Sequence, residues 1–412
     1  MKNQTLSEQI FSHAVGHPVQ PGEIIVVRPD IVMSHDSLTP GIIDILQNDF
    51  GKTNVFDPEQ LVFVFDHVSP PSTVGTADSQ NKVRAFSKKQ NIPLFEVGRG
   101  ICHQLLVEEG IAQPGAIVLG ADSHSTSYGA VGAFGSGMGS TDVAIVWATG
   151  KTWLRVPETI RVLVHGRFSN GASPKDLALK IGRMLTISGA TYQAIEYHGL
   201  DWLPLNGRQA LCSMAVELGA KAGIVPPTGE IPQHFNVPDW LFVDSHAGYV
   251  RTVEIDLDKL EAQIAIPHAV DNVADVTSLA GLAIHQIFLG TCTNGRYEDM
   301  REAANILRGH QVSPNVRFIV TPASQKELLK AMQDDTLSTL VKAGAILTPP
   351  GCGACMGRHQ GTLGKNEVCL STGNRNFRGR MGDPSSQIYL VSPVVAAASA
   401  ITGVITNPQS IE

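Results

Sequence analysis

The sequence predicts an α/β protein made of three packed domains. Short apolar runs recur along the 412 residues and alternate with Gly-rich turns and helical stretches, which is typical of α/β folds. A chain of this length is too long for one hydrophobic core. We expect domain 1 at residues 1–155, domain 2 at 156–272 and domain 3 at 273–412, in mutual contact because no low-complexity linker separates them.

The N-terminal segment predicts an amphipathic helix, since Thr5 and Glu8 have the spacing of a capping box. The segment lacks the apolar stretch of a signal peptide, so we expect a cytoplasmic protein. The longest apolar run, 394–405, is interrupted by Ser399 and Gly403, which predicts a buried helix and not a membrane span. The net charge of −7 gives no general attraction for nucleic acids or membranes.

Polar or reactive side chains follow four of the predicted strands. The predicted strand 61–65 precedes Asp66 and His67, and 116–120 precedes Asp122 and His124. The predicted strand 287–290 precedes Cys292, and 345–347 precedes Cys352. Ligands bind at the carboxyl ends of strands in open parallel sheets. We therefore expect four separate strands to contribute side chains to one region.

The middle of the chain continues the same alternation. Residues 160–165 and 253–257 predict strands, and Ser173 opens a helical pattern that extends through Ile181. The Gly-rich stretch 129–139 is a poor match to a dinucleotide-binding loop, because it lacks a clean G-x-G-x-x-G and the acidic residue expected after a second strand. We interpret it as close backbone packing beside the site.

Three cysteines are the candidate metal ligands: Cys292, Cys352 and Cys355. A Cys-x-x-Cys pair alone could be a redox pair, half of a zinc site or two core residues. A third thiol at a strand end favours a three-thiolate metal site with one open position, and the pattern leaves zinc and iron–sulfur as alternatives. The other cysteines are expected to be small buried side chains, namely Cys102, Cys212 and Cys369.

Two pairs of carboxylate and imidazole indicate acid–base chemistry. Asp66 precedes His67, and Asp122 lies two residues before His124, so each carboxylate can orient a ring and stabilise its charge. One such pair would more often be structural, but two pairs at strand ends favour a site. Two further candidates are His103 and His35. Surface or packing roles are expected for His13, His17, His234, His310 and His359.

The loop 373–380 places Arg375, Arg378 and Arg380 within six positions. Guanidinium groups bind carboxylate or phosphate in a bidentate manner. An exposed basic loop and an RNA-binding loop are the alternatives, although the acidic net charge and the lack of interleaved aromatic residues disfavour RNA. With an acid–base centre and a metal in the same chain, a polycarboxylate substrate is favoured.

Taken together, these segments resemble the aconitase superfamily. The matching segments, in the order found in that superfamily, are Asp66-His67, 120–124, 213–220, 290–295, 351–355 and 374–380. They span nearly the whole chain, so the resemblance is specific. It implies three packed α/β domains of the aconitase type, corresponding to domains 1 to 3, and a hydro-lyase activity.

The resemblance also implies roles for single residues. Cys292, Cys352 and Cys355 would hold one [4Fe-4S] cluster, whose fourth iron binds water or the substrate hydroxyl and carboxylate. His67, oriented by Asp66, would protonate the departing hydroxyl. The residues around the iron-bound water would be Asp122, His124, His103 and Glu217. The substrate-binding residues would be His35, Ser123, Asn374, Arg375 and Arg380.

Three departures from the superfamily pattern narrow the expectation. His35 stands where aconitases have glutamine and the isopropylmalate group has histidine, and Ser213 stands where asparagine is usual, so no direct role is expected for Ser213. The Gly-Ser-Ser-Arg motif, which carries the base on a fourth, swivelling domain, does not occur in the sequence. By this likeness the chain is a large subunit whose partner, a small subunit, carries the swivelling domain and the catalytic serine.

The expected reaction is removal and re-addition of water on a hydroxy-dicarboxylate. Isomerisation of 2- and 3-isopropylmalate in leucine biosynthesis is favoured, and homoaconitase-type and 2,3-dimethylmalate substrates are the alternatives. Two alternative functions outside the enzyme class are an iron-sensing RNA-binding module and a structural zinc protein.

Overall fold

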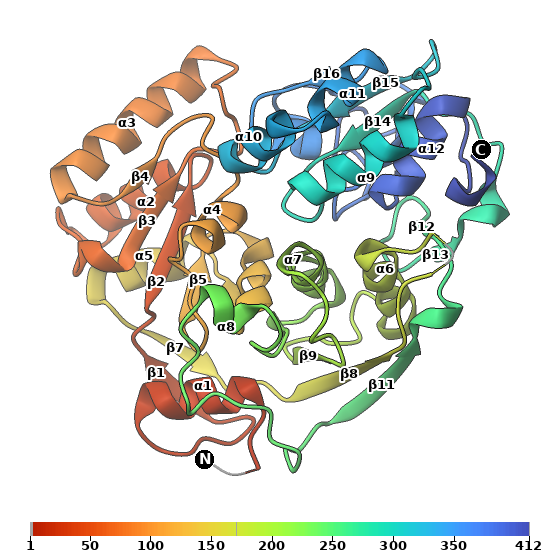
Figure 1. The fold of residues 1–412 in the computed structure, drawn as a ribbon. Coiled ribbons are helices and arrows are strands. Elements are labelled where there is room, and N and C mark those ends of the chain that lie inside the picture. The colour runs from red at the N-terminus through yellow and green to blue at the C-terminus, as the bar shows by residue number, and fades with distance from the viewer. Residues whose placement is uncertain (1–2, 170, 412) are drawn as a thin grey trace.

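A computed structural model describes residues 3–169 and 171–411 of the chain. The first body of the fold is a parallel sheet of five strands in the order β4-β3-β2-β5-β6 (Figure 1). Its strands are β2 (Ile31–His35), β3 (Leu61–Val64), β4 (Leu94–Phe95), β5 (Ile117–Gly120) and β6 (Phe134–Gly137). The helices that accompany it are α2 (Thr39–Asp44), α3 (Val74–Gln90), α4 (Cys102–Glu108) and α5 (Ser140–Thr149).

The N-terminal helix α1 (Leu6–Val15) begins at the predicted capping box. The Thr5 side chain accepts a hydrogen bond from the Glu8 amide, and the Glu8 carboxylate accepts one from the Thr5 amide. A two-stranded antiparallel ribbon of β1 (Ile24–Val27) and β7 (Thr152–Arg155) lies near this helix (Figure 1). The prediction for the N-terminal segment is therefore confirmed.

The second body is a parallel sheet of four strands in the order β10-β9-β8-β11. Its strands are β8 (Thr159–His165), β9 (Ala194–His198), β10 (Ala222–Ile224) and β11 (Arg251–Asp256), and its helices are α6 (Pro174–Leu185), α7 (Leu205–Met214) and α8 (Ile231–His234). Buried apolar side chains of this sheet, such as Ile195, belong to the same core cluster as Phe288 of the third sheet. The shared core confirms that these regions pack against each other.

The third body is a mixed sheet of seven strands in the order β13-β12-β18-β17-β14-β15-β16. Its strands are β12 (Gln263–Ala265), β13 (Val273–Asp275), β14 (Gln286–Leu289), β15 (Arg317–Val320), β16 (Ile346–Leu347), β17 (Val368–Ser371) and β18 (Gln387–Leu390). Its helices are α9 (Tyr297–Leu307), α10 (Gln325–Gln333), α11 (Thr336–Lys342) and α12 (Pro393–Thr402). Strands β14 to β18 are parallel to their neighbours in this group, whereas β12 pairs antiparallel with both β13 and β18.

The strands predicted at 61–65, 116–120, 287–290 and 345–347 correspond to β3, β5, β14 and β16. The chain passes from the second sheet to the third between Asp256, the last residue of β11, and Gln263, the first residue of β12. The domain boundaries at 155 and 272 stay predictions.

Glycines of the stretch 129–139 lie against neighbouring backbone, as predicted. A Cβ atom added to Gly129 would lie 1.7 Å from the carbonyl oxygen of Gly223, and one added to Gly135 would lie 2.2 Å from the carbonyl oxygen of Ser125. Only glycine permits such approaches. The first contact joins the 3₁₀ helix Ser123–Val131, which follows β5, to strand β10 of the second sheet.

The run predicted as a buried helix forms α12, and its residues Val395 to Ala398 are fully buried. Across residues 3–169 and 171–411, no helix combines the length and apolar character that a membrane span needs. The cytoplasmic location stays a prediction.

Candidate active site

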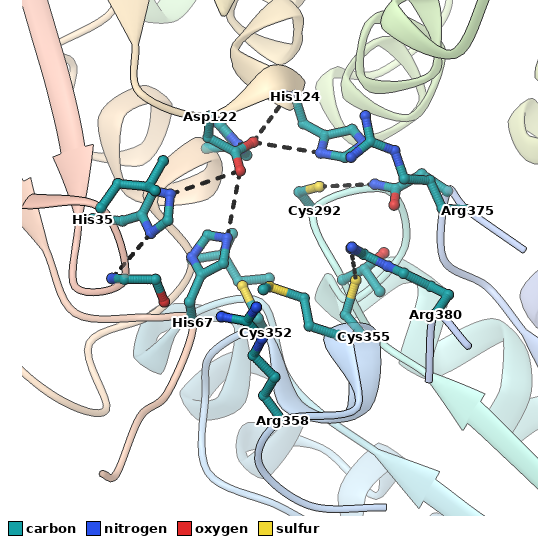
Figure 2. Close-up of a pocket in the computed structure, with 17 residues that line it drawn as sticks. His35, His67, Asp122, His124, Cys292, Cys352, Cys355, Arg358, Arg375 and Arg380 are labelled. Atoms are coloured by element: carbon teal, nitrogen blue, oxygen red, sulfur yellow. Dashed lines mark hydrogen bonds and ion pairs between the residues drawn. The ribbon is translucent and has the colours of Figure 1, made fainter. Parts of the chain in front are cut away.

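A cavity of about 260 Å³ collects most of the predicted site residues (Figure 2). The predicted residues that line it are His35, His67, His103, Asp122, His124, Cys292, Cys352, Cys355, Asn374, Arg375 and Arg380. Most of them come from loops or 3₁₀ turns that follow strands of the first and third sheets, whereas His35 is the last residue of β2 and His103 lies on α4. The predicted residues Asp66, Ser123 and Glu217 do not line the cavity but contact residues that do.

The three candidate thiols lie on one side of this cavity. Cys292 and Cys352 are buried and Cys355 is half-buried. The Asn374 amide donates to the Cys292 sulfur at 3.2 Å, and the Arg380 guanidinium donates to the Cys355 sulfur at 3.3 Å. Figure 2 shows these cysteines across the cavity from His35.

The donor set fits a metal cluster. Burial, together with the charge of Cys355, raises the pKa of Cys292 to about 12, so burial opposes a free thiolate at this position. Metal coordination deprotonates a thiol outright, and N–H donors to sulfur stabilise the resulting charge. Cys102, Cys212 and Cys369 are also buried but do not line the cavity, as expected for core residues.

His67 and Asp66 form a buried pair. The Nδ1 atom of His67 lies 2.7 Å from Oδ1 of Asp66, whose other oxygen accepts a hydrogen bond from the Cys102 amide at 2.8 Å. Burial alone would lower the pKa of His67, but the negative charges of Cys352 and Asp66 hold it well above its ordinary value. These charges favour the protonated ring, and Asp66 fixes its orientation, which suits a proton donor.

Asp122 is the centre of a group of four histidines. One carboxylate oxygen lies 2.7 Å from Nε2 of His103, and the other lies 3.4 Å from Nε2 of His67. The His124 amide donates to the first oxygen at 2.8 Å, and Nε2 of His35 lies 3.9 Å from the second. Burial would raise the pKa of Asp122, but the hydrogen bonds from His103, His124 and His67 hold it well below its ordinary value.

A second chain of contacts runs from His124 to the arginine loop. Nε2 of His124 lies 2.8 Å from Oε1 of Glu217, which also accepts a hydrogen bond from Nε of Arg375 at 2.7 Å. The same guanidinium donates to the hydroxyl of Ser123 at 2.9 Å. Contacts to Glu217 and Ser123 fix the plane of the Arg375 guanidinium at the cavity wall, where it can bind a carboxylate.

Other residues of the predicted loops have different roles. Arg378 is exposed and does not line the cavity, unlike Arg375 and Arg380. Ser213 is buried and donates to the carbonyl of Ala210 and to the hydroxyl of Thr293, and its lack of a direct role stays a prediction. None of the five histidines assigned to surface or packing roles is among the described residues that line the cavity.

Two residues at the site were missed from the sequence. Asp36 is buried and accepts hydrogen bonds from the amides of His67 at 3.0 Å and Val68 at 2.8 Å, while the His35 ring stacks on the His67 ring with centroids 3.7 Å apart. Arg358 lines the cavity as a third guanidinium (Figure 2). The available signals were a carboxylate directly after His35 and a basic residue three positions after Cys355.

Comparison with known proteins adds the family. A sequence profile of the Aconitase family (aconitate hydratase) matches residues 8–283 and 274–403. The chain is 54% identical to the 3-isopropylmalate dehydratase large subunit of Herpetosiphon aurantiacus, over 99% of this chain and 97% of that protein. It is 51% identical to the homoaconitase large subunit of Thermus thermophilus, over 99% of this chain and 98% of that protein.

A solved structure, that of Thermococcus kodakaraensis aconitase X in its holo-form, is similar with a TM-score of 0.52. The match covers 90% of this chain and 89% of that one at 13% identity, and so concerns the fold alone. The family implies an iron–sulfur cluster, in agreement with the thiols of the cavity. The chain therefore belongs to the aconitase family, and its reaction class is that of a hydro-lyase.

Proposed function

We propose that the chain is the cluster-bearing large subunit of a dehydratase that removes and re-adds water on a hydroxy-dicarboxylate. The favoured reaction is the interconversion of 2- and 3-isopropylmalate. The observation that carries the proposal is the presence of three thiols, a buried and hydrogen-bonded His67–Asp66 pair and two guanidiniums around one cavity of about 260 Å³. The name of the relative from Herpetosiphon aurantiacus supports the substrate.

In this proposal Cys292, Cys352 and Cys355 hold one [4Fe-4S] cluster. When bound, the cluster supplies an iron with an open position that polarises a hydroxyl or carboxylate oxygen as a Lewis acid. The thiols fit this role because three of them line one cavity and two accept N–H donors.

The other side chains bind the substrate and move protons. His67 gives its Nε2 proton to the departing hydroxyl, and Asp66 stabilises the ring before and after the transfer. Arg375 and Arg380, with Asn374, bind the substrate carboxylates, and His35 and Ser123 complete that wall. Glu217 and Asp122 orient the water that leaves and returns, and Asp122 acts through its contacts with His103 and His124.

We further propose a small subunit as partner, which carries the swivelling domain and the catalytic serine that removes the substrate proton. Both relatives cited above are named large subunits, and this chain covers nearly all of each. The cavity of this chain supplies an acid and anion-binding groups, and in this proposal the partner supplies the base.

A tricarboxylate of the homoaconitase type is the second candidate substrate. Arg358 lines the cavity, and across the part of the chain that the structure describes its guanidinium has no hydrogen-bond or ion-pair partner. A third guanidinium at the cavity suits a third carboxylate. The 51% identity to a homoaconitase large subunit supports the same alternative.

The test is an assay of the anaerobically reconstituted chain with its small subunit on 3-isopropylmalate, homocitrate and 2,3-dimethylmalate. We expect turnover of 3-isopropylmalate, and preference for homocitrate would favour the second candidate. Iron and sulfide analysis should give a [4Fe-4S] content of one per chain. A colourless chain that binds one zinc, or RNA binding by the apo chain without turnover, would refute the proposal.

A further inference from the structure

Lys175 is buried at a position that is unfavourable for a lysine. Lys175 is fully buried, and it is the only lysine buried in this way among the described residues 3–169 and 171–411. It is also the second residue of α6, where the positive end of the helix dipole repels a cation. Lysine is almost never fully buried unless it is paired. A specific set of contacts must therefore offset these costs.

The contacts of Lys175 are backbone carbonyls of the arginine loop. Its Nζ donates to the carbonyl oxygen of Thr372 at 2.9 Å and to that of Gly373. These residues follow β17 and directly precede Asn374 and Arg375. The side chain thus crosses from the second sheet region to the third, over a separation of 197 residues to Thr372 and 198 to Gly373.

The helix that carries Lys175 is itself fixed to the third sheet. The neighbouring Asp176 accepts hydrogen bonds from the Gln263 amide of β12 at 2.7 Å and from the Ser173 amide at 2.8 Å. The first contact joins the start of α6 to the third sheet, and the second belongs to the capping box of the helix itself. Lys175 therefore extends toward the arginine loop from a helix end that is hydrogen-bonded to the third sheet.

The turn that Lys175 contacts determines where two site residues point. Asn374 donates from the next position to the Cys292 sulfur at 3.2 Å and to the Thr293 hydroxyl at 3.2 Å. Arg375 follows, with its guanidinium held by Glu217 and Ser123. Burial lowers the pKa of Lys175 to about 7, and the charge of Cys292 opposes that shift. Since an amine donates through N–H in both protonation states, the two carbonyl contacts persist at pH values on either side of this pKa.

We propose that Lys175 is a positioning residue, which fixes the Thr372–Gly373 turn and thereby holds Asn374 against the Cys292 loop and Arg375 at the cavity wall. The part of this proposal that concerns substrate binding rests on the proposed function. The part that concerns the turn does not, because it is a property of the chain without substrate.

The test compares Lys175→Met with Lys52→Met in the full chain, assembled with its small subunit. Lys52 is exposed, and it controls for the loss of a lysine-to-carbonyl contact, because its Nζ donates to the carbonyl of Ala148 at a helix end outside the cavity. Hydrogen exchange of peptides that cover 372–380 should be faster in Lys175→Met, with no change in peptides from α3. The KM of the substrate should rise roughly 10-fold to 100-fold, the range for residues that support metal-site ligands, with a smaller change in kcat.

A second variant guards against loss of folding. Lys175→Gln keeps a donor and should restore part of the exchange protection and part of the KM. Unchanged exchange over 372–380 in Lys175→Met, or faster exchange spread over the whole chain in both variants, would overturn the proposal. If the wild-type assembly turns over none of the three acids, the proposed function fails, while the exchange comparison still decides whether Lys175 fixes the turn.

Discussion

Two groups of buried or half-buried carboxylates in this molecule have pKa values that shift in opposite directions. The first group surrounds the cavity and consists of Asp66, Asp122 and Glu217, and the pKa of each is lowered. The second group lies near the start of α6 and on α9 and consists of Asp176, Asp299 and Glu302. Burial raises the pKa of Asp176 to about 6, that of Asp299 to about 6 and that of Glu302 to about 8.

The difference comes from the partners and not from the depth of burial. Burial opposes ionisation in both groups, but imidazoles outweigh it at the cavity, where three histidines donate to Asp122. Asp176 instead receives neutral donors from Gln263 and Ser173, and Asp299 and Asp176 raise the pKa of Glu302 further. Ionised carboxylates at the cavity thus depend on the histidines, which is the property that an acid–base site needs.

The largest effect is expected for Asp122→Asn, which removes the charge on which the histidines converge. We expect kcat to fall roughly 10³-fold, within the range of acid–base groups, because the rings lose their shared partner. Glu302→Gln, the corresponding change in the second group, should leave kcat nearly unchanged. Steady-state kinetics of both variants, with the iron content of each measured, tests this difference in kcat. Equal losses of kcat in the two variants would show that the two groups of carboxylates do not differ in their contribution to catalysis.

A smaller effect is expected for Asp66→Asn. The change keeps the size of the side chain but removes the charge that stabilises protonated His67, so kcat should fall roughly 10²-fold. Kinetics at matched iron content tests this, and a thermal melt checks that the loss of the Cys102 contact has not unfolded the chain. Full activity of a correctly folded variant would show that the acid does not depend on the charge of Asp66.

Asp36→Asn should have a milder effect, because Asp36 contacts the backbone amides of His67 and Val68 and not the reacting groups. Burial would raise the pKa of Asp36, but its contact with His35 and the charge of His67 lower it to about 2. We expect a roughly tenfold loss of kcat, as for other supporting contacts, with little change in KM. A change in KM alone would assign Asp36 to substrate binding instead.

The weakest effect concerns stability and pH. The pKa of Glu302 rises from 4.5 to about 8 on folding, so its contribution to stability is complete below pH 4.5 and is lost as the pH rises through 8. Relative to wild type, Glu302→Gln should therefore gain at least about 1.4 kcal/mol of unfolding free energy between pH 5 and pH 9, the value of one pKa unit. Urea unfolding at both pH values measures it, with the exposed Glu261→Gln as the control.

Part of the site could be predicted because strand ends determine it. The residues after β3 and β5 lie at one edge of the first sheet because those strands are parallel, so His67 and Asp122 were accessible from the sequence. Cys292 follows β14 of the third sheet, so its position at a strand end was predictable, but the meeting of the two sheet edges was not. Asp36 was not, because its contact with the His67 amide requires β2 and β3 to be neighbours, with His35 opposite Val64. Sequence periodicity does not give that order.

Contacts between sheets were the part that the sequence did not reveal. Lys175 looks like an ordinary residue of a helix start, and only the packing of α6 against the loop after β17 buries it. Strands β12 and β13 lie on either side of residue 272 and pair with each other, and β12 joins the third sheet through an antiparallel contact with β18. Short antiparallel edge strands carry no periodicity that assigns them to a particular sheet.

The contact of Gly129 with the carbonyl of Gly223 also limits which substitutions the protein can accept. In a saturation library selected for growth, codon 129 should retain glycine alone, since even alanine would force the 3₁₀ helix and β10 apart. Codon 41, where an added Cβ meets no atom within 4 Å, should accept many residues. Selection on this family would then act on a packing contact outside the cavity as strictly as on the residues that perform the chemistry.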